Sequence, residues 1–100
     1  MFIDIHAHAY RIQPLKPDGS KWVSAESLIE FYDKHNIDAG VLLPLVSPEC
    51  NSPQCNEDIL EMAEKYPGRF IPFCNVDPRA LSNDPHAPLE KVLIRYKEMG

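Results

Sequence analysis

The chain alternates between short apolar runs and longer segments with helical periodicity. Residues 2–8, FIDIHAH, alternate apolar and polar positions in the manner of a strand. Residues 39–46 form a continuous apolar run, as in a parallel strand covered on both faces, and residues 69–76 form a third strand candidate. Proline cannot donate to a sheet ladder, so we expect Pro44 to end the second strand and Pro72 to interrupt the third.

Three segments between and after these strands have the periodicity of amphipathic helices, over residues 24–35, 52–66 and 86–100. Each is bounded by residues that commonly start or stop a helix. The expected boundary residues are Ser24, Asn36, Ser52, Pro53, Pro67, Gly68, Pro88 and Gly100. The apolar stripes are Ala25, Leu28, Ile29 and Tyr32, then Cys55, Ile59, Met62 and Tyr66, and finally Leu89, Val92, Leu93 and Tyr96.

The order strand–helix, repeated along the chain, predicts an α/β fold with a parallel sheet and right-handed crossovers. Side chains alternate along a strand, so Ile3, Ile5 and Ala7 are expected to face the covering helices and to share one core with the helical stripes. The loops at 10–23 and 47–53 follow strands, which predicts that both lie at the carboxyl edge of the sheet. An open sheet of three strands leaves an unpaired edge, so we expect this chain to be the first part of a larger domain.

The most specific feature of the sequence is the pair His6 and His8 in the first strand. Both side chains are expected on one face near the carboxyl end of the strand, together with the deeper Asp4. Two such imidazoles can converge on one ion at about 2.0–2.1 Å, and parallel α/β folds place their chemistry at this edge. The alternative is a pair of surface histidines without an ion. Asp4 would support a metal-bound histidine from behind or make hydrogen bonds in the core.

The charge balance argues against two classes of partner. The formal net charge is −5 and no basic run occurs, so neither nucleic acid nor an anionic membrane is an expected partner. No apolar run approaches the ~20 residues that span a bilayer, and no basic region of a signal peptide precedes the apolar start. Three cysteines without a CxxC pair fit a reducing compartment. We expect a cytoplasmic protein with a small-molecule substrate, with homo-oligomer formation left open.

Several stretches resemble one known family. FIDIHAHAY, residues 2–10, is similar to the first-strand motif of the amidohydrolase superfamily, especially the amidohydrolase-2 group of metal-dependent hydrolases and decarboxylases. GRFIPFCNVDPRA, residues 68–80, resembles the third-strand segment of that group, and APLEKVLIRYKEMG, residues 87–100, resembles the helix that follows. The resemblance implies that residues 1–100 are the N-terminal portion of a single metal-dependent hydrolase domain. They would form the first three βα units of a (β/α)8 TIM barrel.

The resemblance also implies a chemistry. His6 and His8 would be metal ligands at the barrel mouth, and a metal-activated water would cleave a C–N or C–O bond. The family takes its further ligands from later strands: a carboxylate or carboxylated lysine, two histidines and an aspartate. The 100 residues alone are therefore expected to be inactive. Two imidazoles favour zinc, with manganese as the second choice.

Three other functions stay open from the sequence. The same family includes non-oxidative decarboxylases, in which the ion orients a carboxylic acid. TatD-like nucleases and PHP-type phosphoesterases also open with paired histidines, although the Asn-Val-Asp-Pro-Arg segment argues against them. A small α/β binding module, such as a flavodoxin-like domain, is the non-enzymatic alternative. That alternative is weakened because no Gly-rich phosphate loop follows the first strand.

Three polar residues are candidate substrate contacts. Tyr10 and Arg11 directly follow the histidine pair, and an arginine suits a substrate carboxylate. Asn75 lies at the end of the third strand, where it could reach a substrate or serve as a turn residue before Asp77. Arg79 is expected to pair with Asp77 or to brace the loop.

Overall fold

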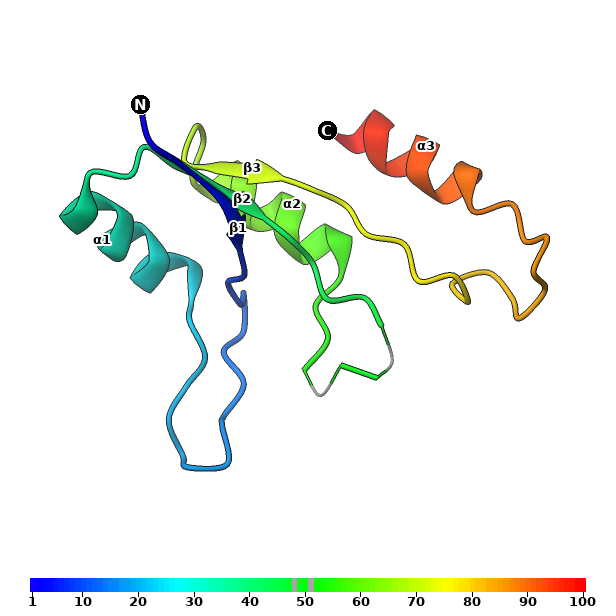
Figure 1. The fold of residues 1–100 in the computed structure, drawn as a ribbon, viewed down its shortest axis with the longest axis horizontal. Coiled ribbons are helices and arrows are strands. Elements are labelled where there is room, and N and C mark those ends of the chain that lie inside the picture. The colour runs from blue at the N-terminus through cyan, green and yellow to red at the C-terminus, as the bar shows by residue number, and fades with distance from the viewer. Residues whose placement is uncertain (48, 51) are drawn as a thin grey trace.

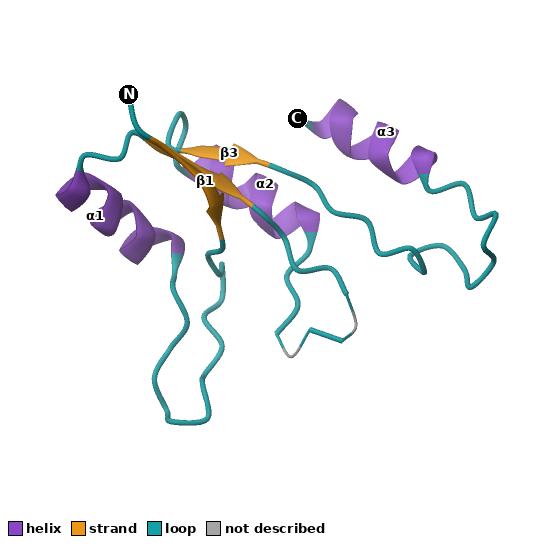
Figure 2. Ribbon diagram, viewed as in Figure 1, coloured by secondary structure: helices purple, strands orange, loops and turns teal. Residues whose placement is uncertain are grey.

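The computed structural model describes residues 1–47, 49–50 and 52–100, and within these ranges three parallel strands alternate with three helices in an open α/β sheet (Figure 1). In chain order the elements are β1 (Ile3–Ala7), α1 (Ala25–His35), β2 (Ala39–Leu42), α2 (Asn56–Lys65), β3 (Phe70–Pro72) and α3 (Glu90–Met99). The sheet order is β1-β2-β3, with β1 and β3 at the edges (Figure 2). The predicted α/β class and parallel pairing are confirmed. None of the helices in these ranges is long and apolar enough to cross a membrane.

The residues that flank α1 set both of its ends. The Ser24 hydroxyl oxygen accepts a hydrogen bond from the Ser27 N–H at 3.1 Å, and the Ser27 hydroxyl oxygen accepts one from the Ser24 N–H at 3.0 Å. This reciprocal cap satisfies N–H groups that have no partner inside the helix. At the other end Asn36 has a φ of 55°, the left-handed conformation that stops the helix. Both predicted ends of this helix are confirmed.

The start of α2 differs from the prediction. The sequence predicts Ser52 as N-cap and Pro53 as the first helical residue, but α2 begins at Asn56. Gln54 pairs with Leu45 in an antiparallel bridge through backbone hydrogen bonds of 3.0 and 3.1 Å. This pairing keeps the chain in a ladder as far as Gln54, so the helix cannot start before it.

The cap of α2 lies at Cys55, whose N–H donates to the Asp58 carboxylate at 3.1 Å. Because Cys55 precedes the helix it is exposed, and the prediction that it belongs to the apolar stripe is wrong. Ile59 and Met62 of the same stripe are buried as predicted, and Tyr66 is half-buried.

Strands β2 and β3 are shorter than the apolar runs that predicted them. β2 ends at Leu42, two residues before Pro44, as the expected strand end requires. Pro72 is the last residue of β3, and the chain leaves the sheet after Phe73 donates its N–H to the Leu42 carbonyl at 3.0 Å. The second half of the predicted third strand is therefore wrong, because β2 ends at Leu42 and the Asn75 N–H donates to the Asn56 side chain instead of to a strand.

The hydrophobic core lies between one face of the sheet and helices α1 and α2. Tyr32 of α1, Leu42 of β2 and Ile59 of α2 are fully buried. Phe70 of β3 meets the rings of Tyr32 and Tyr66 edge-on, with centroids 6.4 and 5.7 Å apart. Apolar and aromatic contacts of this kind are the main source of stability in a domain of this size.

An irregularity in β1 breaks the regular alternation of its side chains between the two faces of the sheet. β1 takes three steps, from Asp4 to Ala7, where β2 takes two. Such a bulge shifts the alternation, so that Asp4 and Ala7 both lie on the covered face. Ile3 and Ile5 lie on the opposite face and are 43% and 80% exposed. The prediction that these two isoleucines face the helices is wrong. We call the face that carries them, together with the exposed Ile71 of β3, the open face.

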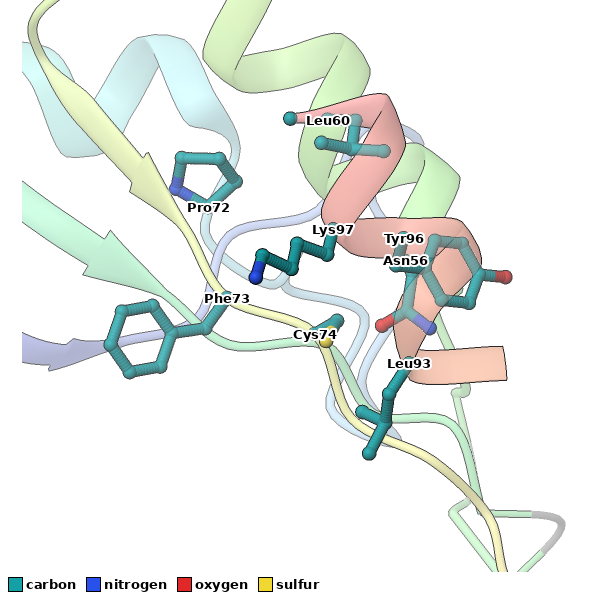
Figure 3. A pocket seen from close by; sticks show the side chains of 9 residues that line it. Asn56, Leu60, Pro72, Phe73, Cys74, Leu93, Tyr96 and Lys97 are labelled. Atoms are coloured by element: carbon teal, nitrogen blue, oxygen red, sulfur yellow. The ribbon is translucent and has the colours of Figure 1, made fainter. Parts of the chain in front are cut away.

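α3 does not join the core. None of its residues is buried, and Leu93 is 47% exposed. The chain runs away from the sheet before α3 begins (Figure 1), and a cavity of about 160 Å³ lies between α3, α2 and Pro72 (Figure 3). Leu60 and Tyr96 border this cavity. The prediction that the stripe of α3 packs in the common core is wrong, because the long connection places the helix beside the sheet's end rather than on its face.

Candidate metal centre

The end of β1 brings the rings of His6 and His8 together. Their Nε2 atoms lie 3.2 Å apart, and the two rings meet edge-on with centroids 5.1 Å apart. His6 is exposed and His8 is half-buried. The predicted convergence of the two imidazoles is therefore present in the structure.

The other ring nitrogen of His8 fixes the orientation of that ring. Nδ1 lies 2.8 Å from the Leu43 carbonyl oxygen, which can only accept a hydrogen bond. Nδ1 therefore carries the proton in the neutral ring, and the lone pair of Nε2 can accept a hydrogen bond from His6 Nε2 or bind an ion. The Leu43 N–H donates to the Ala7 carbonyl at 3.0 Å, so the chain just after β2 holds this carbonyl in place. A metal-binding histidine is commonly held in this way by a backbone carbonyl on its second nitrogen.

The geometry of the pair fits two ligands of one ion. An ion at about 2.05 Å from two atoms that are 3.2 Å apart would see them at an angle of roughly 100°, close to tetrahedral. Within the described ranges, no group of three or more His, Cys, Asp and Glu side chains could hold a metal. The two histidines therefore supply at most half of a tetrahedral ligand set in this part of the chain.

Asp4 does not lie where the sequence predicts. Its Oδ2 accepts a hydrogen bond from the Tyr32 hydroxyl at 2.9 Å, and its Oδ1 accepts one from the backbone N–H of His6 at 3.1 Å. The bulge turns Asp4 to the covered face, away from the face of the histidine rings. The expectation that Asp4 shares a face with His6 and His8 is wrong, and its contact is with the backbone of His6.

Tyr10 is buried in the base of the loop that follows the histidines. Its N–H donates to the Val23 carbonyl at 2.8 Å, and its ring lies 6.1 Å from that of Trp22. Burial, and then the nearby Cys50, raise the pKa of the Tyr10 phenol, which keeps it protonated. The structure thus gives Tyr10 a packing contact, and its contact with a substrate stays a prediction.

Arg11 is directed to α2. Its Nε donates to the Asp58 carboxylate at 2.6 Å and lies 3.5 Å from a carboxylate oxygen of Glu61. Two carboxylates therefore already neutralise this guanidinium, and a substrate carboxylate would have to compete with them. Substrate binding by Arg11 stays a prediction that requires this ion pair to open.

Asn75 joins three elements at the carboxyl edge of the sheet. Its side-chain amide donates to the Pro44 carbonyl after β2, and its N–H donates to the Asn56 side-chain oxygen, both at 2.9 Å. The Asn56 side-chain amide in turn donates to the Asn75 carbonyl at 2.9 Å. These bonds join distant segments and are not those of a local turn, and contact of Asn75 with a substrate stays a prediction. The predictions from the sequence do not include this role of Asn56. The pattern that would indicate it is a polar residue at the start of a helix, directly before an apolar stripe.

The loops after β2 and β3 are also tied by charge. The guanidinium of Arg79 donates to a Glu49 carboxylate oxygen at 2.7 Å and lies 3.4 Å from Asp77. Hydrogen bonds from Arg79 and then Ser47 lower the pKa of Glu49 to about 2, so Glu49 remains an anion. Pairing of Arg79 with Asp77 and bracing of the loop, the two expected alternatives, occur together.

Comparison with protein-family models, with curated proteins and with solved structures finds no match to the chain. The histidine pair and the edge of the sheet on which it lies are therefore the features of this chain that bear on its function.

Proposed function

We propose that the chain contributes the first part of a metal-dependent hydrolase, in which His6 and His8 hold a divalent ion at the carboxyl edge of a parallel barrel. The observation that carries this proposal is the approach of the two Nε2 atoms to 3.2 Å, with the Leu43 carbonyl on the other nitrogen of His8. A bound ion would lower the pKa of a water molecule toward 7 and polarise the carbonyl of the scissile C–N or C–O bond. Zinc is the proposed ion, with manganese second.

The shape of the sheet supports a (β/α)8 barrel as the complete fold. The three strands are parallel and in sequential order, and helices α1 and α2 cover one face. Ile3, Ile5 and Ile71 are exposed on the open face, where further barrel strands would cover them. The radius of gyration of 14.8 Å exceeds the ~13 Å expected for a compact domain of this length. We therefore propose that the open α/β sheet of this chain is the first part of a (β/α)8 barrel.

The chain's own residues would have limited tasks in this reaction. His6 and His8 bind the ion, and the carbonyl of Leu43 keeps the Nε2 lone pair of His8 available. Within the described residues, no third His, Cys, Asp or Glu joins the pair in a group that could hold a metal. The base that takes the proton from water would come with the missing ligands. We therefore propose that these 100 residues do not turn over substrate alone. A small-molecule substrate, a cytoplasmic location and homo-oligomer formation remain predictions.

The test is a zinc-binding measurement on the 100-residue chain and its histidine variants. Elemental analysis after dialysis should show bound zinc in the wild type and less in His6→Ala and His8→Ala. His86→Ala is the matched control, because His86 lies in an exposed loop before α3, and it should retain zinc. Equal zinc content in all four proteins would contradict the proposal.

A second measurement addresses the reaction. Lactones, amides and aromatic carboxylates are offered to the chain with added zinc or manganese, and hydrolysis and decarboxylation are followed separately. No turnover is expected from the 100 residues alone. Turnover that disappears in His6→Ala would contradict the incompleteness of the site, and the product would tell a hydrolase from a decarboxylase.

A further inference from the structure

The backbone that carries His6 is held from the covered face of the sheet. One carboxylate, that of Asp4, accepts hydrogen bonds from both the Tyr32 hydroxyl at 2.9 Å and the His6 N–H at 3.1 Å. The carboxylate therefore links helix α1 to the first histidine. The link spans the bulge of β1, which begins at Asp4 and ends at Ala7.

Tyr32 can reach this position because residue 40 is a glycine. A Cβ at Gly40 would lie 2.1 Å from the Tyr32 hydroxyl oxygen and 2.7 Å from two of its ring carbons. The fully buried ring thus lies directly against the backbone of β2, with its hydroxyl beside the neighbouring strand. Burial, and then the hydrogen bond to Asp4, raise the pKa of Tyr32, so the hydroxyl remains a donor.

We infer that Tyr32 and Asp4 are positioning residues for the histidine pair: they hold the bulged backbone of His6, from which its ring meets that of His8. This inference rests on the proposed function, because it assigns the support of the same two ligands. The bulge lets Asp4 lie on the covered face while the histidine rings do not. In a regular strand Asp4 would lie on the same face as His6 and His8. His8 has its own support in the Leu43 carbonyl, so loss of the Tyr32 hydroxyl acts first on His6.

The test is a zinc titration followed in the histidine-ring signals of long-range proton–nitrogen NMR spectra. The wild-type chain is compared with Tyr32→Phe and with the matched control Tyr66→Phe. The Tyr66 hydroxyl also donates to a carboxylate, that of Glu26 at 2.8 Å, but this bond links the end of α2 to α1 and not to β1. The signals of His35 and His86 serve as references within every spectrum, and the spread of backbone amide signals shows that each variant is folded.

Tyr32→Phe is expected to shift the ring-nitrogen signals of His6 before zinc is added and to weaken zinc binding about tenfold. Tyr66→Phe is expected to change neither, even where it lowers stability by a similar amount. Unchanged His6 signals and unchanged zinc affinity in Tyr32→Phe would overturn the positioning role and leave the metal proposal intact. If the wild type binds no zinc through its histidine pair, the proposed function fails, and the His6 signals of the zinc-free proteins then decide the positioning role alone.

Variants at Asp4 give the second arm. Asp4→Asn keeps an oxygen that can accept a hydrogen bond from the His6 N–H. Its new amide group can donate to the Tyr32 hydroxyl oxygen, so near-wild-type His6 signals are expected. Asp4→Ala removes both bonds and should reproduce the shift of Tyr32→Phe. Equal His6 signals in Asp4→Ala and the wild type would overturn the inference.

Discussion

Helices α2 and α3 have the same length and a similar amphipathic pattern, yet they pack against the rest of the protein in different ways. Each has 10 residues. α2 buries Ile59 and Met62 against the sheet, whereas α3 buries none of its residues. One contact from α3 to α2 is polar: the Tyr96 hydroxyl donates to the Glu57 carboxylate at 2.7 Å.

The difference shows what an apolar stripe specifies. Periodicity along a helix determines which side chains share a face, but the connection to the preceding strand determines what that face meets. α2 runs directly into β3 through the short turn at Gly68, so its stripe returns to the sheet. α3 follows a long connection from Phe73 to Leu89 and therefore lies beside a cavity at the end of the sheet instead of against its face.

The largest effect should come from the stripe of α2. Ile59→Ala removes a fully buried side chain from the core and should lower the free energy of unfolding by about 2–5 kcal/mol. Urea unfolding followed by circular dichroism measures this loss. A loss of only a few tenths would mean that α2 is no better packed than α3.

An intermediate effect is expected where α1 meets the sheet. Gly40→Ala would place a methyl group 2.1 Å from the Tyr32 hydroxyl oxygen, so the helix or the strand must move. Overpacking of this kind costs about 1–3 kcal/mol, measurable by the same unfolding experiment. An unchanged midpoint of unfolding would show that α1 is held more loosely than the burial of Tyr32 indicates.

A smaller effect should appear when acid breaks the ion pair between Glu26 of α1 and Lys65 of α2. Hydrogen bonds from Lys65, from its own backbone N–H and from Tyr66 lower the pKa of Glu26 from 4.5 to about 2. The folded-state pKa is the lower one, so this stabilisation is complete above pH 4.5 and is lost as the pH falls toward 2. Because the Lys65 and Glu26 side chains are 62% and 54% exposed, solvent screening limits the contribution to about 0.2–1 kcal/mol.

Glu26→Gln provides the measurement for this link. The difference in unfolding free energy between the variant and the wild type should shrink as the pH falls through this window. A difference that is constant with pH would contradict the assignment.

The smallest effect is expected for the stripe of α3. Leu93→Ala should change the free energy of unfolding by no more than about 0.5 kcal/mol, because the side chain is 47% exposed. Chemical denaturation of Leu93→Ala and Ile59→Ala side by side tests the comparison directly. Similar losses in the two variants would show that α3 packs as firmly as α2.

The sequence predicts the order of elements well because each helix and strand depends on local pattern and capping. Ser24 and Asn36 set the ends of α1 through hydrogen bonds and backbone conformation within a few residues of one another. The sequence predicts too early a start for α2, because the bridge from Gln54 to Leu45 joins residues nine positions apart. No local pattern reports such a contact.

The sequence predicts the histidine pair for a related reason, but it does not predict that Asp4 and Tyr32 hold the backbone of His6. Two histidines separated by one residue share a face in a regular strand, so the sequence pattern alone predicts that they lie close together. The bulge that moves Asp4 to the other face depends on how many residues of β1 pair with β2, which is a property of the sheet. The role of Tyr32 requires in addition the crossover of α1 over that bulge.

The close contact between Gly40 and Tyr32 also constrains how this sequence can diverge. A Tyr32→Phe change would not make room for a side chain at position 40, because two ring carbons would remain 2.7 Å from the new Cβ. Only a smaller, non-aromatic side chain at position 32 would admit one. Homologous sequences are therefore expected to change these two positions together, with the glycine retained wherever an aromatic ring lies at position 32. An alignment would reveal this as covariation between a helix and a strand that are adjacent in the chain.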